Sequence, residues 1–278
     1  MTIFRIQEHN EAFYILSNIS KKYNSKIDLI HIDSHTDLDA FLLEKKFDKN
    51  IKSFSDQEKL NLTNWDVTIS SYITACIKFR LLNNIIYLGH QLKPRISFVS
   101  ANTYQISQKL LGIEINNEKP DKNPMTLYYS VTYNDRIIEL ITKPLVISID
   151  LDFFYTDNVK GNQIKIQISD EEARKISNGK NPVRLKFGQA VRVIKEGQRF
   201  FVYLNFLDQF RDLSTKLPET IIKSNFRKLK IFLKTNITKK PEAIILCKSV
   251  KSGYLPYQQQ ELVNKYTDEI VDFLNYLF

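Results

Sequence analysis

The segment Ile27-Asp28-Leu29-Ile30-His31-Ile32-Asp33-Ser34-His35-Thr36-Asp37 contains the pattern that decides the fold. Its first half is a short apolar run bounded by polar residues, which is typical of a strand buried on both faces. Its second half places Asp33, His35 and Asp37 at alternate positions, and such positions face the same way in an extended chain. The segment therefore predicts a buried strand that delivers three ligand-type side chains at its carboxyl end.

A second segment repeats this pattern. Residues 145–149 form another apolar run, and Asp150 and Asp152 stand at its end. In open α/β sheets, functional residues gather outside the carboxyl ends of the strands. Carboxylates at such positions also cap helices or form turns. A D-x-H-x-D motif together with a D-x-D motif, each following a buried strand, nevertheless favours a metal site.

The remaining histidines also lie near predicted strands. His9 follows a short strand and precedes a helix, so it is either a further ligand or a structural residue. His90 follows the apolar run 85–88 and is either a turn residue or an acid/base group. His31 lies two positions before Asp33, and it is either a core residue or one that orients a ligand.

Periodicity and turn signals outline the other elements. Strands are predicted at 3–6, 27–32, 85–88, 95–99, 145–149 and 243–246, and a β-hairpin at 125–133 and 137–141. Helices are predicted after Asn10 as N-cap, at 67–82, from Asp170, and at 200–217, 219–234 and 258–277. With no repeat or linker, we expect one α/β domain over residues 1–278, with three α/β/α layers and a mainly parallel central sheet.

Composition narrows the class of protein. The chain is 43% hydrophobic and 26% charged, as in globular proteins. We find no apolar run of transmembrane length and no signal-peptide core, so we expect a cytoplasmic location and no membrane partner. Cys76 and Cys247 lie in apolar contexts and are expected to be free buried thiols outside any metal motif.

The net charge of +9 raises the question of a nucleic-acid partner. The lysines are spread along the chain, without a glycine-rich loop or an RNA-recognition signature, and this argues against such a partner. A solvated basic exterior and a surface for an acidic peptide are the two remaining interpretations.

The residue types also indicate a chemistry. Six candidate ligands are available, which are His9, Asp33, His35, Asp37, Asp150 and Asp152. Carboxylates with only two imidazoles favour Mn²⁺, with Mg²⁺, Fe²⁺ and Zn²⁺ as competitors. Six ligands exceed what one ion with an open position needs, whereas two ions bridged by carboxylates would use them all. Metal-assisted hydrolysis is the reaction class that these residues indicate.

These motifs together resemble those of the arginase/ureohydrolase superfamily. Three segments, His31–His35, Ser148–Phe154 and Glu8–Ala12, are most similar to the peptide arginases, which modify arginine side chains in ribosomally made peptides. The resemblance implies an arginase-like fold with two Mn²⁺ ions, and conversion of peptidyl arginine to ornithine and urea. The implied partner is an arginine-containing peptide, with or without an acidic leader.

The resemblance also implies how the ligands divide. One ion would be held by His9, Asp33, Asp37 and Asp150, and the other by Asp33, His35, Asp150 and Asp152. Asp33 and Asp150 would bridge the two ions, and Asp152 or His90 would protonate the departing amine.

The chain departs from the free-arginine enzymes in two ways. His9 lacks a glycine-rich loop, and Phe153-Phe154 follow the D-x-D motif. Loops that would grip the ammonium and carboxylate of a free amino acid are not recognisable, which favours a peptide substrate. Two alternatives remain, which are a single-zinc deacylase or amidohydrolase on the same fold and a non-enzymatic basic binding protein.

Overall fold

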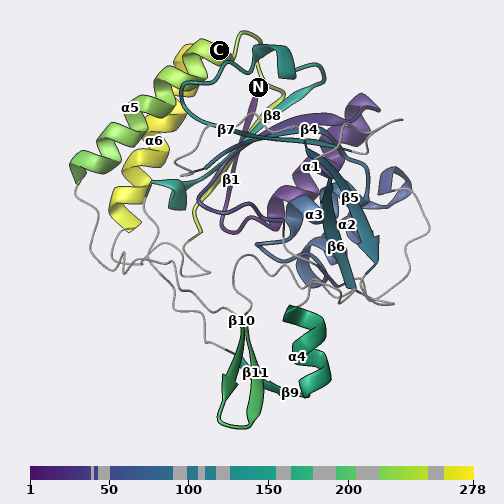
Figure 1. Cartoon of the computed structure of the whole chain (residues 1–278). Coiled ribbons are helices and arrows are strands. Elements are labelled where there is room, and N and C mark those ends of the chain that lie inside the picture. Colours follow the sequence, from purple (N-terminus) through teal and green to yellow (C-terminus); the bar gives the residue numbers. More distant parts are fainter. Residues whose placement is uncertain are drawn as a thin grey trace.

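The computed structural model describes residues 1–38, 41–42, 51–89, 99–105, 110–116, 126–154, 164–177, 192–204, 219–249 and 260–278 (Figure 1). The strands are β1 (Thr2–Ile6), β2 (Ile27–Ile32), β3 (Phe41–Leu42), β4 (Leu82–Leu88), β5 (Val99–Gln105), β6 (Leu110–Asn116), β7 (Leu127–Val131), β8 (Leu145–Asp150), β9 (Ile164–Ile168), β10 (Arg192–Glu196), β11 (Arg199–Leu204) and β12 (Ala243–Cys247). The helices are α1 (Glu11–Tyr23), α2 (Asp56–Trp65), α3 (Tyr72–Lys78), α4 (Asp170–Ser177), α5 (Glu219–Asn236) and α6 (Gln260–Leu277). Short 3₁₀ turns are η1 (Ile51–Ser53), η2 (Ile138–Leu140) and η3 (Leu151–Phe153).

A mainly parallel sheet forms the centre of the molecule. In the part of the chain that the structure describes, it has nine strands in the order β1-β12-β8-β2-β4-β7-β5-β6-β3. The first six of these strands are all parallel to their neighbours. The last three extend the sheet by antiparallel pairing. These six strands confirm the prediction of a mainly parallel central sheet.

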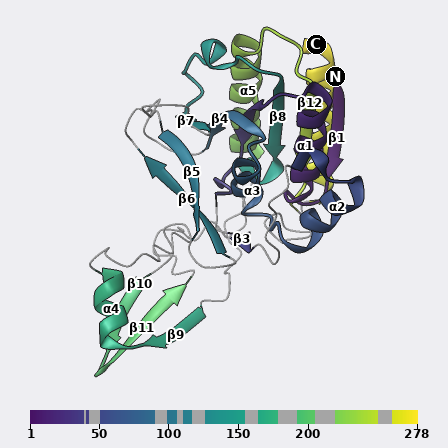
Figure 2. The same ribbon diagram turned by 90° about the vertical axis from the view of Figure 1, so that its right-hand side faces the viewer.

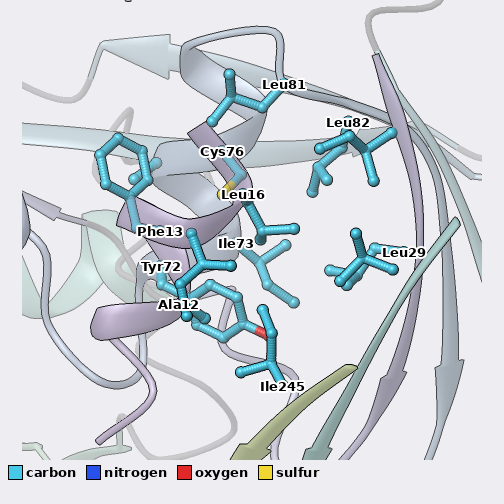
Figure 3. Packing of buried hydrophobic residues seen from close by; sticks show 14 of the residues in the cluster. Ala12, Phe13, Leu16, Leu29, Tyr72, Ile73, Cys76, Leu81, Leu82 and Ile245 are labelled. Atoms are coloured by element: carbon cyan, nitrogen blue, oxygen red, sulfur yellow. The ribbon is translucent and has the colours of Figure 1, made fainter. Parts of the chain in front are cut away.

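Helices cover both faces of this sheet. Helices α1 and α3 pack on one face, where Phe13 and Ile73 lie in one apolar cluster with Leu29 of β2 (Figure 3). Helices α5 and α6 pack on the other face, where Phe226 and Ile270 join the cluster that contains Ile30. Figure 1 shows these two helical layers on opposite sides of the strands, and Figure 2 views the molecule from the side of α1, α2 and α3. Because alternate residues of β2 face different layers, all six are buried, which explains the nearly continuous apolar run.

The two motif-bearing strands lie at the point where the chain reverses its direction across the sheet. β2 and β8 are parallel neighbours, with Ile30 opposite Ile147. The next parallel strand of this sheet after β2 is β4, on one side, and the next one after β8 is β12, on the other. Such a switch point leaves a crevice outside the carboxyl ends of the two strands, where open α/β sheets place their ligands.

Most of the predicted elements that flank this point are confirmed. The strands near 3–6, 27–32, 85–88, 145–149 and 243–246 are present, as are the helices predicted at 219–234 and 258–277. The helix that follows Asn10 is also present, and its Ala12, Phe13, Leu16 and Ile19 are buried.

Asn10 occupies the predicted N-cap position of α1, but its side chain does not cap the helix. Asn10 makes no cap hydrogen bond, and its amide donates instead to the carbonyl of Thr63. Glu11 Oε1 accepts hydrogen bonds from the amides of Gln7 and Glu8, which precede the helix, at 3.0 Å each. These bonds hold the backbone that leads to His9.

The predicted hairpin at 125–141 is wrong. β7 pairs in parallel with β4, and residues 138–140 form a 3₁₀ turn rather than a strand. Side chains satisfy the backbone that a hairpin would have paired. Asp135 accepts from the amide of Thr132 at 2.6 Å, and Asn236 of α5 accepts from the amide of Ile137 at 2.8 Å.

Two helix predictions need correction. The predicted helix at 67–82 is confined to α3, because Arg80 adopts a left-handed conformation (φ 56°) and Leu82 already belongs to β4. The start of the predicted helix at 200–217 is strand β11, which pairs with β10 and β9 in a separate three-stranded sheet. Gly197, with φ 60°, makes the turn between β10 and β11.

Other predictions lie beyond what the structure tests. Most of the predicted strand at 95–99 and residues 205–217 lie outside the described residues. No helix among the described residues is long and apolar enough to cross a membrane. The single domain over 1–278 and the cytoplasmic location remain predictions.

Candidate metal centre

Polar side chains gather at the carboxyl ends of four neighbouring strands, β1, β12, β8 and β2. The segment after β1 supplies His9, and the segment after β2 supplies Asp33, His35 and Asp37. The end of β8 supplies Asp150, and η3 supplies Asp152. The structure therefore brings together all six side chains that the sequence predicts as metal ligands.

The first carboxylate of each motif also forms a turn. Asp33 Oδ1 accepts from the amide of His35 at 2.7 Å, and Asp150 Oδ1 accepts from the amide of Asp152 at 2.9 Å. The ordinary role of a strand-end carboxylate is thus present in both motifs. It accounts for only one oxygen of each residue, because Asp33 Oδ2 and Asp150 Oδ2 point toward His9 instead.

Three carboxylates converge on one nitrogen of His9. Its Nδ1 lies 3.0 Å from Asp33 Oδ2, 2.9 Å from Asp37 Oδ2 and 3.2 Å from Asp150 Oδ2. This nitrogen carries at most one proton, so it cannot donate to three carboxylates at once. Among the described residues, Asp33 Oδ2 and Asp37 Oδ2 are buried without a hydrogen-bond partner.

The spacing of these atoms fits a shared cation. Ligands about 2.1 Å from one metal ion and at right angles to each other lie about 3 Å apart. The separations around His9 Nδ1 are close to this value. A divalent cation among these atoms would supply the positive charge that the buried oxygens lack, and the donor set suits an oxygen-preferring ion.

A second group of ligands shares Asp33 with the first. His35 Nδ1 lies 2.9 Å from Asp152 Oδ2 and 3.5 Å from Asp33 Oδ1. The two oxygens of Asp33 therefore face different groups. The side chain of His35 is 30% exposed, whereas those of Asp33 and Asp37 are 1% and 6% exposed. Solvent consequently reaches the cluster on the side of His35.

The carboxylates make one another hard to ionise. Burial, followed by the charge of Asp33, raises the pKa of Asp37 to about 7 and that of Asp152 to about 6. Burial and the charge of Asp152 raise the pKa of Asp150 as well. This concentration of buried negative charge is costly unless cations balance it.

The histidines supply part of that balance. Burial alone would lower the pKa of His35, but Asp152 and Asp33 raise it to about 12. Burial likewise acts against protonated His9, and the carboxylates around it raise its pKa well above the usual value. The cluster without a metal ion therefore retains protons that a divalent cation would displace.

His31 lies beside the cluster and is completely buried. Its Nε2 is 3.2 Å from the carbonyl oxygen of His35 and 3.5 Å from Asp33 Oδ2, and its Nδ1 is 3.1 Å from the hydroxyl of Tyr72. Burial lowers the pKa of His31 to about 4, so its ring is neutral at pH 7. This position agrees with a residue that orients the ligands, although that role remains a prediction.

Sequence reasoning missed two residues at the carboxyl end of β12, which are its last residue, Cys247, and Ser249 two positions later. Both cysteines are free and buried, as predicted, but Cys247 also lies in one cluster of possible ligand atoms with His9 and Asp150. Ser249 donates a hydrogen bond to Asp150 Oδ2. The only sequence signal was that both residues follow the last predicted strand. The other candidate ligands likewise follow predicted strands.

The backbone is strained at two positions in the cluster. Asp37 has φ 49° and Ser249 has φ 48°, in the left-handed region that non-glycine residues seldom adopt. Such conformations persist where surrounding contacts impose them, and they gather at functional sites. Both residues also direct side chains toward the cluster. His90, the predicted acid/base group, lies outside the described residues.

A scan against models of known protein families found no match for this chain, and a search of curated proteins found no relative. The fold and the site therefore define the class. The chain is a parallel α/β protein with a buried cluster of histidines and aspartates, joined by Cys247, that could hold metal ions.

Proposed function

We propose that the chain is a metal-dependent hydrolase with two divalent cations, preferably Mn²⁺, in this cluster. The observation that carries the proposal is the convergence of three carboxylate oxygens on His9 Nδ1, with a second ligand group sharing Asp33. When bound in such a site, two divalent cations activate water as a nucleophile near neutral pH and stabilise developing negative charge.

The geometry supports part of the division of ligands that the arginase resemblance implies, because one group contains His9, Asp33 and Asp37 and another contains Asp33, His35 and Asp152. His9, Asp33, Asp37 and Asp150 would hold one ion, and Asp33, His35, Asp150 and Asp152 the other. Asp33 suits a bridging role because its two oxygens face the two groups. Asp150 directs Oδ2 toward His9 and Oδ1 toward the backbone of Asp152.

The reaction that we propose is hydrolysis of an arginine side chain within a peptide, giving ornithine and urea. The support for this substrate is the likeness of the two metal motifs and the His9 segment to those of peptide arginases. Solvent reaches the cluster at His35, beside Asp152. Asp152 Oδ2 would therefore carry a proton to the departing amine nitrogen, and His90 is the alternative donor.

Two observations argue against the competing functions. A single-zinc deacylase would use a reduced set of one D-x-H and one Asp, which gives no role to the close approach of Asp37 to His9. In a binding protein whose carboxylates only form turns, the convergence of Asp33 Oδ2 and Asp37 Oδ2 on the single nitrogen His9 Nδ1 would have no role.

Metal analysis combined with a urea-release assay tests this proposal. We expect chelation to abolish urea release from arginine-containing peptides, and Mn²⁺ to restore it better than Zn²⁺ because oxygen ligands dominate. Full turnover after chelation would exclude a metal mechanism. Bound metal without urea release from any arginine peptide would instead retain the metal centre and reject the arginine substrate.

A further inference from the structure

Cys247 is a buried thiol beside the candidate metal centre, and it has no part in the proposed reaction. It is the last residue of β12, the strand between β1 and β8. The register of the sheet pairs it with Ile6 of β1 and with Asp150 of β8. It therefore lies at the same level of the sheet as Asp150, and close to the segment after β1 that carries His9.

The alternation of side chains along β12 decides the face on which the thiol lies. Ile245 and Cys247 belong to the apolar cluster beneath α1 and α3, whereas Leu246 belongs to the cluster beneath α5 and α6. The segment that leads into α1 carries His9. The thiol thus lies on the face of the sheet that is covered by the helix following His9.

The contacts of the sulfur connect it to the cluster. Cys247 Sγ lies 3.3 Å from Ser249 Oγ, and the Ser249 hydroxyl donates to Asp150 Oδ2. His9 Nδ1 lies 3.2 Å from that same oxygen of Asp150. One ligand atom each from His9, Asp150 and Cys247 lies within 4.8 Å of the other two, and all three residues are buried. A nitrogen, an oxygen and a sulfur donor therefore converge.

The second free cysteine has a different environment. Cys76 of α3 is completely buried among apolar side chains of α1 and α3 (Figure 3). In the part of the chain that the structure describes, it belongs to no group of side chains that could hold a metal ion. Buried cysteines commonly serve as small apolar residues, and Cys76 fits that role. This role does not explain why Cys247 lies beside a histidine and a carboxylate.

The types of donor and their spacing suit a thiophilic cation. Ligand atoms bound to one tetrahedral zinc ion lie roughly 3.4–3.6 Å apart, so the three donors need only small movements to share an ion. Thiolate and imidazole ligands favour Zn²⁺ over Mn²⁺. The carboxylate of Asp150 and a Cys247 thiolate would together balance the charge of one divalent cation, which displaces the thiol proton as it binds.

We propose that His9, Asp150 and Cys247 form a site for one thiophilic divalent cation, such as Zn²⁺ or Cd²⁺. This site shares His9 and Asp150 with the first Mn²⁺ site of the proposed hydrolase, so the two ions exclude each other. A thiophilic cation at Cys247 therefore displaces one Mn²⁺ ion and inhibits the enzyme. Only this displacement rests on the proposed function.

Addition of Cd²⁺ to the metal-free protein tests the site. We expect an ultraviolet absorption from thiolate-to-cadmium charge transfer, and its loss in Cys247→Ser. Cys76→Ser is the matched control, because it removes the other buried thiol, and it should keep the absorption. Cooperative thermal unfolding of both variants would show that they are folded. An absorption of wild-type intensity in Cys247→Ser would overturn the proposal.

X-ray absorption of the wild-type protein with one equivalent of Zn²⁺ needs no variant. We expect one sulfur neighbour at about 2.3 Å from the zinc ion. Zinc with only nitrogen and oxygen neighbours would overturn the site.

Competition tests the shared ligands. In protein loaded with Mn²⁺, Cd²⁺ should release one of the two Mn²⁺ equivalents, measured by elemental analysis. Retention of both Mn²⁺ ions beside a sulfur-bound Cd²⁺ would overturn the mutual exclusion. A protein that binds no Mn²⁺ but shows the zinc–sulfur contact would contradict the proposed function instead, and would support the thiophilic site.

Discussion

Asp33 illustrates how one carboxylate serves both structure and chemistry. Oδ1 closes the turn onto the amide of His35, and it also faces the ring of that residue. Oδ2 faces His9 and lies without a hydrogen-bond partner in the described part of the chain. The turn fixes the side chain, so the second oxygen is held where a cation would bind before any cation arrives.

Two histidine variants should separate metal binding from turnover. His9→Ala removes a ligand, so we expect a loss of about one of two bound metal equivalents, measured by elemental analysis after gel filtration. His90→Ala should keep both equivalents and lower urea release by about 10²-fold if His90 supplies a proton. Normal turnover in His90→Ala would make His90 a turn residue, and full occupancy in His9→Ala would remove it from the ligand set.

The protons held by the cluster predict a pH dependence of stability. Between pH 6.5 and 8.5, unfolded aspartates are ionised, and unfolded histidines change from about half protonated to neutral. The folded, metal-free protein still holds protons on Asp37, with a pKa of about 7, and on His35, with a pKa of about 12. Because the folded state binds more protons, its free energy of unfolding should fall as pH rises through this range.

Thermal unfolding at several pH values measures this effect. We expect the Tm of the metal-free protein to fall from pH 6.5 to 8.5, and the increase in Tm on adding Mn²⁺ to grow over the same range, because the cation competes with fewer protons. A metal-free Tm that rises with pH would show that the cluster does not retain these protons.

Some site residues are predictable from the sequence because the strand that they follow places them. Others are not, because a contact between distant elements places them. Asp33, His35 and Asp150 follow apolar runs, so their position at a sheet edge is readable from spacing alone. Tyr72 reaches His31 only because α3 packs on the face of β2. Ser249 approaches Asp150 only because β12 pairs with β8. Such contacts depend on the tertiary arrangement and leave no local pattern.

At the scale of elements, carboxylates lie at both ends of β2. Those at the carboxyl end belong to the candidate metal centre, and the one at the other end links neighbouring strands. Asp28, at the end of the strand away from the cluster, is completely buried. Its oxygens accept hydrogen bonds from the side chain of Asn83 and the amides of Asn84, Thr142 and Lys143, at 2.5–3.1 Å. These bonds join β2 to β4 and to the segment that leads into β8.

Asp28→Ala should therefore destabilise the fold without removing a metal ligand. Leaving one buried and several partly buried N–H groups without acceptors is expected to lower the free energy of unfolding by about 3–5 kcal/mol. Urea unfolding measures this loss. Asp28→Asn should cost less, because its amide oxygen can still accept. If Asp28→Ala unfolded at the wild-type urea concentration, Asp28 would not be the structural link described here.

Strands were predicted correctly where both of their faces are buried. The predictions failed where side chains, rather than a neighbouring strand, satisfy the backbone groups. β2, β8 and β12 read as continuous apolar runs, since helices cover both faces. Residues 137–141 looked like a strand, but Asn236 from α5 satisfies the amide of Ile137. The apolar pattern from residue 200 is compatible with either a helix or a strand. In the structure this segment is strand β11, which pairs with β9 and β10.

At the scale of the whole molecule, the basic charge bears on substrate size. Free arginine carries an ammonium and a carboxylate that are costly to bury without partners. A peptidyl arginine lacks both charges, and its flanking residues can add contacts to a chain of net charge +9. We predict kcat/KM at least ~10³ higher for a cognate peptide than for free arginine, which is roughly 4 kcal/mol.

Competition between the two substrates checks this prediction. Urea release and the mass lost from the peptide report the two reactions in one mixture. Equal or faster turnover of free arginine would reject the peptide substrate and leave the metal centre untouched.

Metal content tests the central claim, that the buried cluster is a two-metal centre, most directly. The protein would be loaded with Mn²⁺, freed of excess ion and analysed for bound manganese. We predict two equivalents per chain, and no more than residual metal in Asp33→Ala, because Asp33 belongs to both ligand groups.

Asp135→Asn is the matched control, since Asp135 is also a carboxylate beyond a strand but accepts its hydrogen bonds from the turn at Thr132. It should keep both equivalents. Wild-type protein without stoichiometric manganese, or Asp33→Ala with the wild-type content, would contradict the claim.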